Sequence, residues 1–141
     1  MGNDQQLTRD DTIDVSVIVV NWNTRDFLQR CLHSLYASER DFALEVIVVD
    51  NASSDDSLQM LRENYSDVVV IANRENCGFA AANNQALAAA RGRLLFLLNP
   101  DTEMDSGALS AMVHFLDQHE TVGVVGPKLT GLDGRIQGGA A

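Results

Sequence analysis

The chain has 141 residues, of which 45% are hydrophobic and 21% are charged, and its formal net charge is −10. This is the composition of a globular domain long enough to bury a core. The negative charge disfavours a nucleic-acid partner, because the phosphates would be repelled. A small phosphorylated ligand remains compatible if a divalent cation lies between it and the protein's carboxylates.

The N-terminal segment, residues 1–13, is polar and mixed in charge, so it does not read as a signal peptide. We expect a disordered lead-in there and a folded domain over residues 14–141. No apolar run approaches the roughly 18 residues that a membrane span needs. Cys31 and Cys77 stand in unrelated contexts, which favours two reduced thiols in a cytosolic protein.

The pattern of apolar residues predicts strands that alternate with helices. The expected strands are 15–20, 44–49, 68–71, 94–98 and 122–125. The expected helices begin at Asn23 or Thr24, at 53–56, at Phe79, and at Asp105 or Ser106. A hairpin is expected over 128–137.

Residues 94–98 form an uninterrupted apolar run before Pro100, which predicts a central strand buried on both faces. The segment 68–71 is expected to be a third buried strand. The alanine-rich helix over 79–91 should lie close to the sheet and end with Gly92 at its C′ position. Together the elements predict an α/β fold with a parallel sheet and helices on both faces.

Polar side chains follow three of the predicted strands at the point where each strand ends. They are Asn21 with Asn23, Asp50 with Asn51, and Asn99 with Asp101. Because the carboxyl ends of parallel strands meet at one edge of a sheet, these groups should face a common ligand. The alternative is that they only make turns and helix caps.

The first strand is not followed by G-x-G-x-x-G, and no P-loop pattern occurs, so an ordinary phosphate-binding glycine loop is excluded. A phosphate-bearing ligand would then need a divalent ion held by Asp101. The amide oxygen of Asn99 could serve beside it, directly or through water.

Four motifs, in this order and spacing, resemble the nucleotide-sugar half of the family-2 inverting glycosyltransferases, which have the GT-A fold. They are VIVVNWN at 17–23, VVDNASSD at 48–55, NCGFAAANN at 76–84 and LLNPDT at 97–102. The segment 124–137 is similar to the rhamnosyltransferase-like branch. The resemblance implies a Rossmann-like, mostly parallel sheet, truncated so that the acceptor half is absent.

The resemblance also implies roles for individual residues. The residues that match nucleotide-binding positions are Asn21, Asn23, Asp50, Asn51, Gly78 and Asn84, with Asp50 on the pyrimidine or its ribose. Asp101 and Asn99 match the D-x-D motif that holds Mn²⁺ or Mg²⁺ on the diphosphate. An amide in place of the first carboxylate should weaken metal binding. The catalytic base is expected downstream of residue 141 and is not assigned.

The implied activity is transfer of a sugar, with inversion, from a UDP- or dTDP-sugar, dTDP-rhamnose included, to a glycan or lipid-linked acceptor. Cell-wall or polysaccharide synthesis would place it in the cytoplasm, with peripheral association at the inner face of the cell membrane as an open alternative. This fragment alone would be inactive. One rival is a nucleotide-binding module without turnover. Another is a nucleotidyltransferase, which would need a glycine-rich basic loop after the first strand.

Several residues have two interpretations. Trp22 could stack on the base or cover the strand edge. Asp55 and Glu103 could contact the site, but acids at such positions more often belong to the start of a helix. Cys77 stays unassigned. Three histidines are expected at the surface or at helix ends: His33, His114 and His119.

Overall fold

The computed structural model describes residues 13–137, so the expected lead-in, apart from Ile13, lies outside the described residues. The strands are β1 (Val15–Asn21), β2 (Leu44–Asp50), β3 (Val69–Ala72) and β4 (Leu94–Leu97). The helices are α1 (Arg25–Ala37), α2 (Ser57–Asn64), α3 (Phe79–Ala89) and α4 (Ala108–Gln118).

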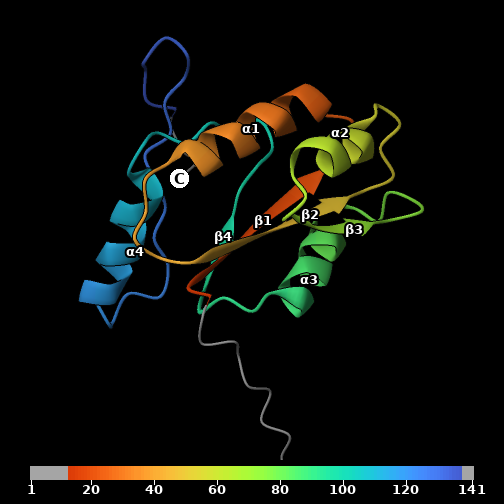
Figure 1. The fold of residues 1–141 in the computed structure, drawn as a ribbon. Coiled ribbons are helices and arrows are strands. Elements are labelled where there is room, and N and C mark those ends of the chain that lie inside the picture. The colour runs from red at the N-terminus through yellow and green to blue at the C-terminus, as the bar shows by residue number, and fades with distance from the viewer. Residues whose placement is uncertain (1–12, 138–141) are drawn as a thin grey trace, which may run out of the picture.

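The four strands form one parallel sheet in the order β3-β2-β1-β4. Asn21 lies opposite Asp50 in the register of β1 and β2, and Ile18 lies opposite Leu97 in that of β1 and β4. Helices α1 and α2 lie on one face of the sheet and α3 lies on the other (Figure 1). The predicted parallel α/β fold with helices on both faces is confirmed. Its carboxyl edge, where the carboxyl ends of the strands meet, carries the loops after β1, β2, β3 and β4.

The core divides into two clusters because successive strand residues point to opposite faces. One cluster joins alternate valines of β1 and β2 to α1, α2 and α4. The other packs Ile18, Ile47 and Val49 against Ala82 and Ala86 of α3. Both alanines are fully buried, so small side chains let α3 lie close to the sheet, as the alanine-rich sequence predicts.

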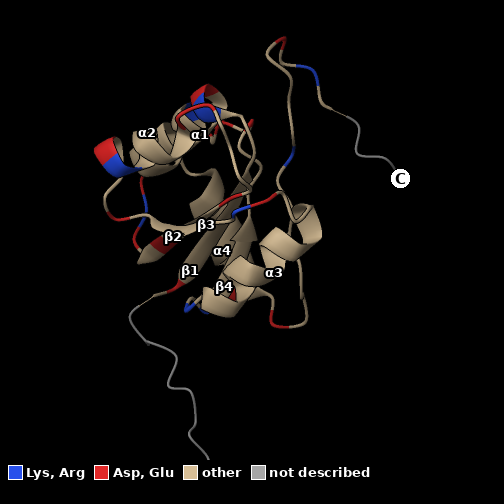
Figure 2. Ribbon diagram, turned by 90° about the vertical axis from the view of Figure 1, so that its right-hand side faces the viewer, with Lys and Arg blue, Asp and Glu red and all other residues tan. Residues whose placement is uncertain are grey.

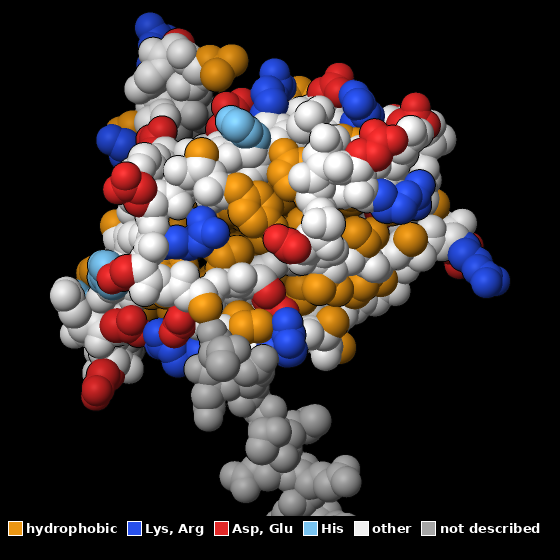
Figure 3. Space-filling model, viewed as in Figure 1, with side chains coloured by type: hydrophobic (Ala, Val, Ile, Leu, Met, Phe, Trp, Pro, Cys, Tyr) orange, Lys and Arg blue, Asp and Glu red, His pale blue; other side chains and the backbone are white. Residues whose placement is uncertain are grey.

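Two strands are less buried than predicted. β4 is an edge strand within residues 13–137, and the side chains of Leu95 and Leu97 are 53% and 55% exposed. β3 is the other edge strand, and its Val69 and Val70 are also exposed. An apolar strand is buried only if other elements cover both of its faces. Helix α3 covers the central strands β1 and β2, so the edge strands β3 and β4 stay partly exposed on that face. Figure 3 shows hydrophobic side chains gathered in the middle of one face of the molecule.

The fifth predicted strand, 122–125, is not formed in the described part of the chain. After α4 the chain runs without a ladder to the expected hairpin, which has one bridge between Thr130 and Ile136 and points away from the helices (Figure 2). Helix α4 begins after Gly107, whose φ is +83°, and not at the predicted caps Asp105 or Ser106. None of the helices within residues 13–137 combines the length and the apolar character needed to cross a bilayer.

Gly92 does not have the predicted role at the end of α3, which ends at Ala89. Its Cα faces β1 so closely that a Cβ would lie 2.4 Å from the backbone nitrogen of Ser16. The Ser16 hydroxyl donates to the carboxylate of buried Glu45 at 2.6 Å and accepts from the Gly92 N–H at 2.8 Å. Gly92 is therefore required for close packing of the chain on β1, at the edge opposite the candidate site.

Candidate functional site

The ends of β1 and β2 are joined by their side chains. The amide nitrogen of Asn21 donates to Asp50 Oδ1 at 2.8 Å and to Ser53 Oγ at 3.1 Å. The Thr24 hydroxyl donates to the Asn21 amide oxygen at 2.7 Å. Asn21 and Asp50 are both fully buried. Their polar groups are satisfied by one another and by Thr24 and Ser53, as is usual for buried polar groups.

The second oxygen of Asp50 accepts the backbone N–H of Ser53 at 2.9 Å, closing a turn in which Ala52 has a φ of +63°. Asn23 attaches to the same turn. Its N–H donates to Ser53 Oγ at 2.9 Å and its amide oxygen accepts the Ser54 N–H at 2.7 Å. The structure thus brings Asn21, Asn23 and Asp50 together. Asp50 lies beneath the turn, where its carboxylate sets the backbone shape.

Asn51 and Gly78 are also brought together, since the Asn51 amide nitrogen donates to the Gly78 carbonyl at 3.3 Å. Asn51 is only 2% exposed. Gly78 has a φ of +85° and open space around it, so a ligand can approach its backbone. Asn84 lies on the exposed side of α3, and no hydrogen bond joins it to this cluster among the described residues.

The loop after β4 is built differently. Asn99 and Asp101 are exposed at the carboxyl edge. The backbone beside them is attached to α1: the Cys31 thiol lies 3.6 Å from the Asn99 carbonyl, and the Ser34 hydroxyl accepts the Met104 N–H at 2.9 Å. Helix α1 therefore holds the loop while the side chain of Asp101 faces solvent.

The carboxylates of this loop affect the pKa of the Cys31 thiol. Burial, together with the nearby carboxylates of Asp101 and Glu103, raises the pKa of the Cys31 thiol to about 12. The thiol therefore stays protonated and unreactive. Glu103 pairs with Arg30 of α1 at 3.6 Å, so it does not belong to the start of α4, five residues further on.

Asp101 and Asn99 fit a metal that is shared with a ligand better than a metal held by protein alone. Within residues 13–137, no group of three His, Cys, Asp or Glu side chains forms a metal cage. Mg²⁺ is commonly held by one or two carboxylates plus substrate phosphates and water. The carboxylate of Asp101 and the amide oxygen of Asn99 are too few to hold such an ion alone. They suffice when a diphosphate and water supply the remaining ligands.

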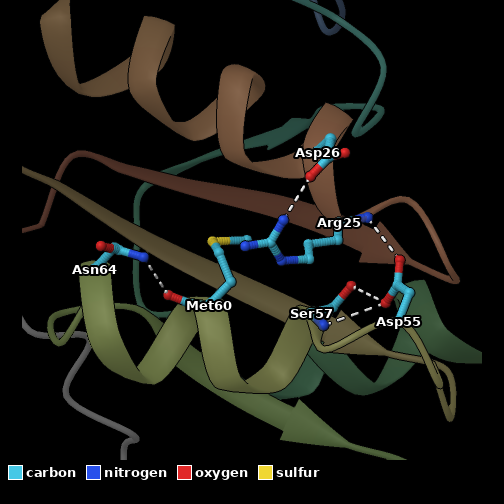
Figure 4. A network of polar contacts seen from close by, with 6 residues as sticks. All are labelled: Arg25, Asp26, Asp55, Ser57, Met60 and Asn64. Atoms are coloured by element: carbon cyan, nitrogen blue, oxygen red, sulfur yellow. Dashed lines mark hydrogen bonds and ion pairs between the residues drawn. The ribbon is translucent and has the colours of Figure 1, made fainter.

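Asp55 acts at the N-termini of two helices (Figure 4). Its carboxylate accepts the Arg25 N–H of α1 at 2.8 Å, and the Ser57 hydroxyl and N–H at the start of α2. Partial burial raises the pKa of Asp55, but these hydrogen bonds lower it by more, so its pKa lies below the usual value. Asp55 is thus an acid at helix starts, as preferred from the sequence. Helix α2 begins at Ser57, later than the predicted 53–56, because those residues form the turn.

A cavity of about 540 Å³ lies between α1 and α2, beside Asn23. Its charged lining residues are four acids and one base, Arg25, and this excess of negative charge disfavours a diphosphate. The acidic residues are Asp26, Asp55, Asp56 and Glu63. We therefore do not assign the donor to this cavity.

The remaining residues have simple surroundings. Trp22 is 56% exposed at the carboxyl edge. The histidines are at the surface, as expected: His114 lies 3.3 Å from Asp41 and His119 stacks on Phe115, while His33 is exposed on α1. The sequence interpretation missed Ser53, which joins the first two loops. It also missed Asn73, although Asn73 follows β3 just as the selected residues follow their strands.

Comparison with known proteins gives a consistent result. The chain matches the model of Glycosyl transferase family 2 over residues 16–135. Over 128 residues it is 31% identical to the poly(ribitol-phosphate) beta-glucosyltransferase of Bacillus spizizenii, a match that covers 86% of this chain and 20% of the relative.

Two solved structures share the fold. A mannosyltransferase from Pyrobaculum calidifontis, in complex with GDP-Man and Mn²⁺, is 30% identical with a TM-score of 0.66, over 72% of this chain and 32% of the other. S. aureus TarS 1–349, in complex with UDP-GlcNAc, is 26% identical with a TM-score of 0.68, over 86% of this chain and 42% of the other. The chain thus spans less than half the length of each of these proteins. Its fold is that of the GT-A glycosyltransferases, and it belongs to glycosyl transferase family 2.

Proposed function

We propose that this chain binds the nucleotide-diphospho-sugar donor of a glycosyltransferase at the carboxyl edge of its sheet. The observation that carries the proposal is that exposed Asp101 shares this edge with the hydrogen-bonded loops after β1 and β2. Structures of similar proteins in complex with GDP-Man and Mn²⁺ and with UDP-GlcNAc support it. UDP and dTDP are the two candidate nucleotides, and the rhamnosyltransferase-like tail suggests dTDP.

The residues have distinct tasks in this proposal. Asn21 and Asp50 fix the backbone of the turn that faces the nucleoside. The nucleotide contacts would come from groups at its surface and on the neighbouring loop, among them Asn23, Gly78 and Asn84. Asp101, with Asn99, would hold Mn²⁺ or Mg²⁺. A divalent cation held there would stabilise the charge on the departing diphosphate.

The whole protein would transfer the sugar with inversion to a glycan or lipid-linked acceptor. A relative named for poly(ribitol-phosphate) supports a cell-wall polymer as acceptor. Such acceptors would place the enzyme in the cytoplasm at the inner face of the membrane. We assign no catalytic base among residues 13–137, and we expect this chain to bind donor without turnover.

Calorimetric titration of the 141-residue chain tests the proposal. UDP, dTDP and GDP are titrated separately, with Mn²⁺ and with EDTA. We expect UDP or dTDP to bind with Mn²⁺ and to bind at least about tenfold more weakly in EDTA, because the cation bridges Asp101 and the diphosphate. A folded chain that binds none of them with Mn²⁺ would contradict the proposal.

A further inference from the structure

Three amide side chains are joined at the carboxyl edge, one after β2, one after β3 and one on α3. The side-chain nitrogen of Asn73 donates to Asn51 Oδ1 at 2.9 Å and to Gln85 Oε1 at 2.8 Å. The Gln85 nitrogen donates back to Asn73 Oδ1 at 3.0 Å, so these two amides form a reciprocal pair. We call Asn51, Asn73 and Gln85 the amide latch.

Hydrogen bonds of the amide latch hold both ends of the loop formed by residues 74–78 in place. At its start, the Asn73 N–H also donates to the Asp50 carbonyl at 2.9 Å. At its end, the Asn51 amide nitrogen holds the Gly78 carbonyl, and the Cys77 sulfur lies 3.2 Å from Asn51 Oδ1. Residues 74–78 themselves are exposed. One buried side chain, Asn51, therefore fixes both ends of an exposed loop.

The hydrogen-bonding groups of Asn51 are engaged in this arrangement. Its oxygen accepts from Asn73 and Cys77, and its nitrogen donates to Gly78. Together with its burial, this leaves the side chain little freedom to contact a nucleotide. Asn51 can affect a ligand mainly through the loop that it holds.

We propose that the amide latch positions the loop 74–78 as one wall of the donor site, and that Asn73 and Gln85 are positioning residues for nucleotide binding. This inference rests on the proposed function. The inference extends the proposed function by assigning a role to two side chains outside the motifs and by giving Asn51 an indirect role.

The latch contributes little to the packing of α3. The buried face of that helix is formed by Ala82, Asn83 and Ala86, whereas Gln85 is exposed. Removing the Gln85 side chain should therefore free the loop without unfolding the domain. Gln59 of α2 offers a matched control, since it is also an exposed helical glutamine and donates to Glu63 at 2.7 Å.

The experiment compares the parent chain with Gln85→Ala, Asn73→Ala, the double variant and Gln59→Ala. We expect Gln85→Ala and Asn73→Ala each to weaken Mn²⁺-dependent UDP binding about three- to tenfold, as for loss of one or two hydrogen bonds. Trypsin should cleave after Arg74 faster in both. The double variant should bind UDP about as tightly as whichever single variant has the lower affinity, because both residues act through one latch. Gln59→Ala should match the parent in affinity and in cleavage after Arg74.

The outcomes separate the latch from the proposed function. If the parent binds UDP and both latch variants bind it as tightly as Gln59→Ala does, the latch inference is wrong and the donor site stands. Additive losses in the double variant would also contradict a single latch. If the folded parent binds none of UDP, dTDP and GDP with Mn²⁺, the proposed function fails and the role of the latch fails with it.

Discussion

The loops after β1 and β2 and the loop after β4 share the carboxyl edge, but they treat their carboxylates in opposite ways. Asp50 is fully buried, and its two oxygens accept from Asn21 and from the Ser53 N–H. Asp101 is exposed, and only the backbone around it is attached to α1. A buried, satisfied carboxylate serves the fold, whereas an exposed carboxylate on a fixed loop is free to bind a cation.

At this edge, Asp50 therefore fixes the shape of a turn, whereas Asp101 is available to bind a ligand. Replacing Asp50 should change stability first, and replacing Asp101 should change binding alone. Each of the following changes tests one side of that contrast.

Asp50→Ala should have the largest effect. It removes the acceptor for two donors, the Asn21 amide and the Ser53 N–H, and leaves them unsatisfied at a buried position. We expect the free energy of unfolding to fall by about 3 kcal/mol in urea denaturation. Asp26→Ala, at an exposed carboxylate, is the control and should cost under about 1 kcal/mol. Equal losses in the two variants would show that Asp50 is not the support of this turn.

Asp101→Ala should leave the urea midpoint unchanged and weaken Mn²⁺-dependent UDP binding about 100-fold or more. Loss of an outer-shell partner costs 10- to 100-fold in metal affinity, and a direct ligand should cost at least that. Asp105→Ala removes an exposed carboxylate nearby and should bind UDP as the parent does. If calorimetry finds parent-like binding by Asp101→Ala, the contrast between the two loops has no functional meaning.

Asn99→Asp should sharpen the contrast by restoring the first carboxylate of D-x-D. Because affinity for a hard cation rises with ligand charge, we expect UDP with Mn²⁺ to bind about tenfold more tightly. Gln118→Glu adds the same charge at the end of α4 and should change little. Weaker binding in Asn99→Asp than in Gln118→Glu would mean that Asn99 does not lie beside the cation.

Asp55→Asn should have the smallest effect, and one that depends on pH. Hydrogen bonds hold the pKa of Asp55 below its usual value, so the stability it contributes is fully present above the unfolded pKa of about 3.9 and is lost as pH falls through the lower folded pKa. We expect a loss of about 1 kcal/mol at pH 7 in thermal unfolding, typical of a helix cap, which shrinks as the pH falls below the unfolded pKa of about 3.9. Asp56→Asn is the control, since its side chain makes no cap hydrogen bond. A loss that is constant between pH 7 and 2 would contradict this role.

The periodicity of the sequence predicts the sheet, its direction and the helices on both faces, because alternating strands and helices leave few other topologies. It overestimates burial in β3 and β4, since an apolar run does not reveal which strands lie at an edge. It also assigns Gly92 to a helix end, whereas the close approach to Ser16 is a tertiary contact that no local pattern shows.

The strand-end pattern identifies the residues of the candidate site but not their exposure. Asp50 and Asp101 look alike in sequence, as carboxylates after apolar strands, and only the structure distinguishes the buried one from the exposed one. The latch residue Gln85 lies within a helix, where an exposed glutamine gives no signal. Its partner Asn73 could have been found by applying the strand-end rule to β3 as well.

The most direct test of the donor site is a crystal structure of this chain grown with UDP and Mn²⁺. We expect the Mn²⁺ to be ligated by Asp101 and by the diphosphate, with the nucleoside against the turn that follows β2 and Asp50 buried beneath it. A nucleotide in the acidic cavity between α1 and α2, or a Mn²⁺ without Asp101 as a ligand, would contradict this assignment.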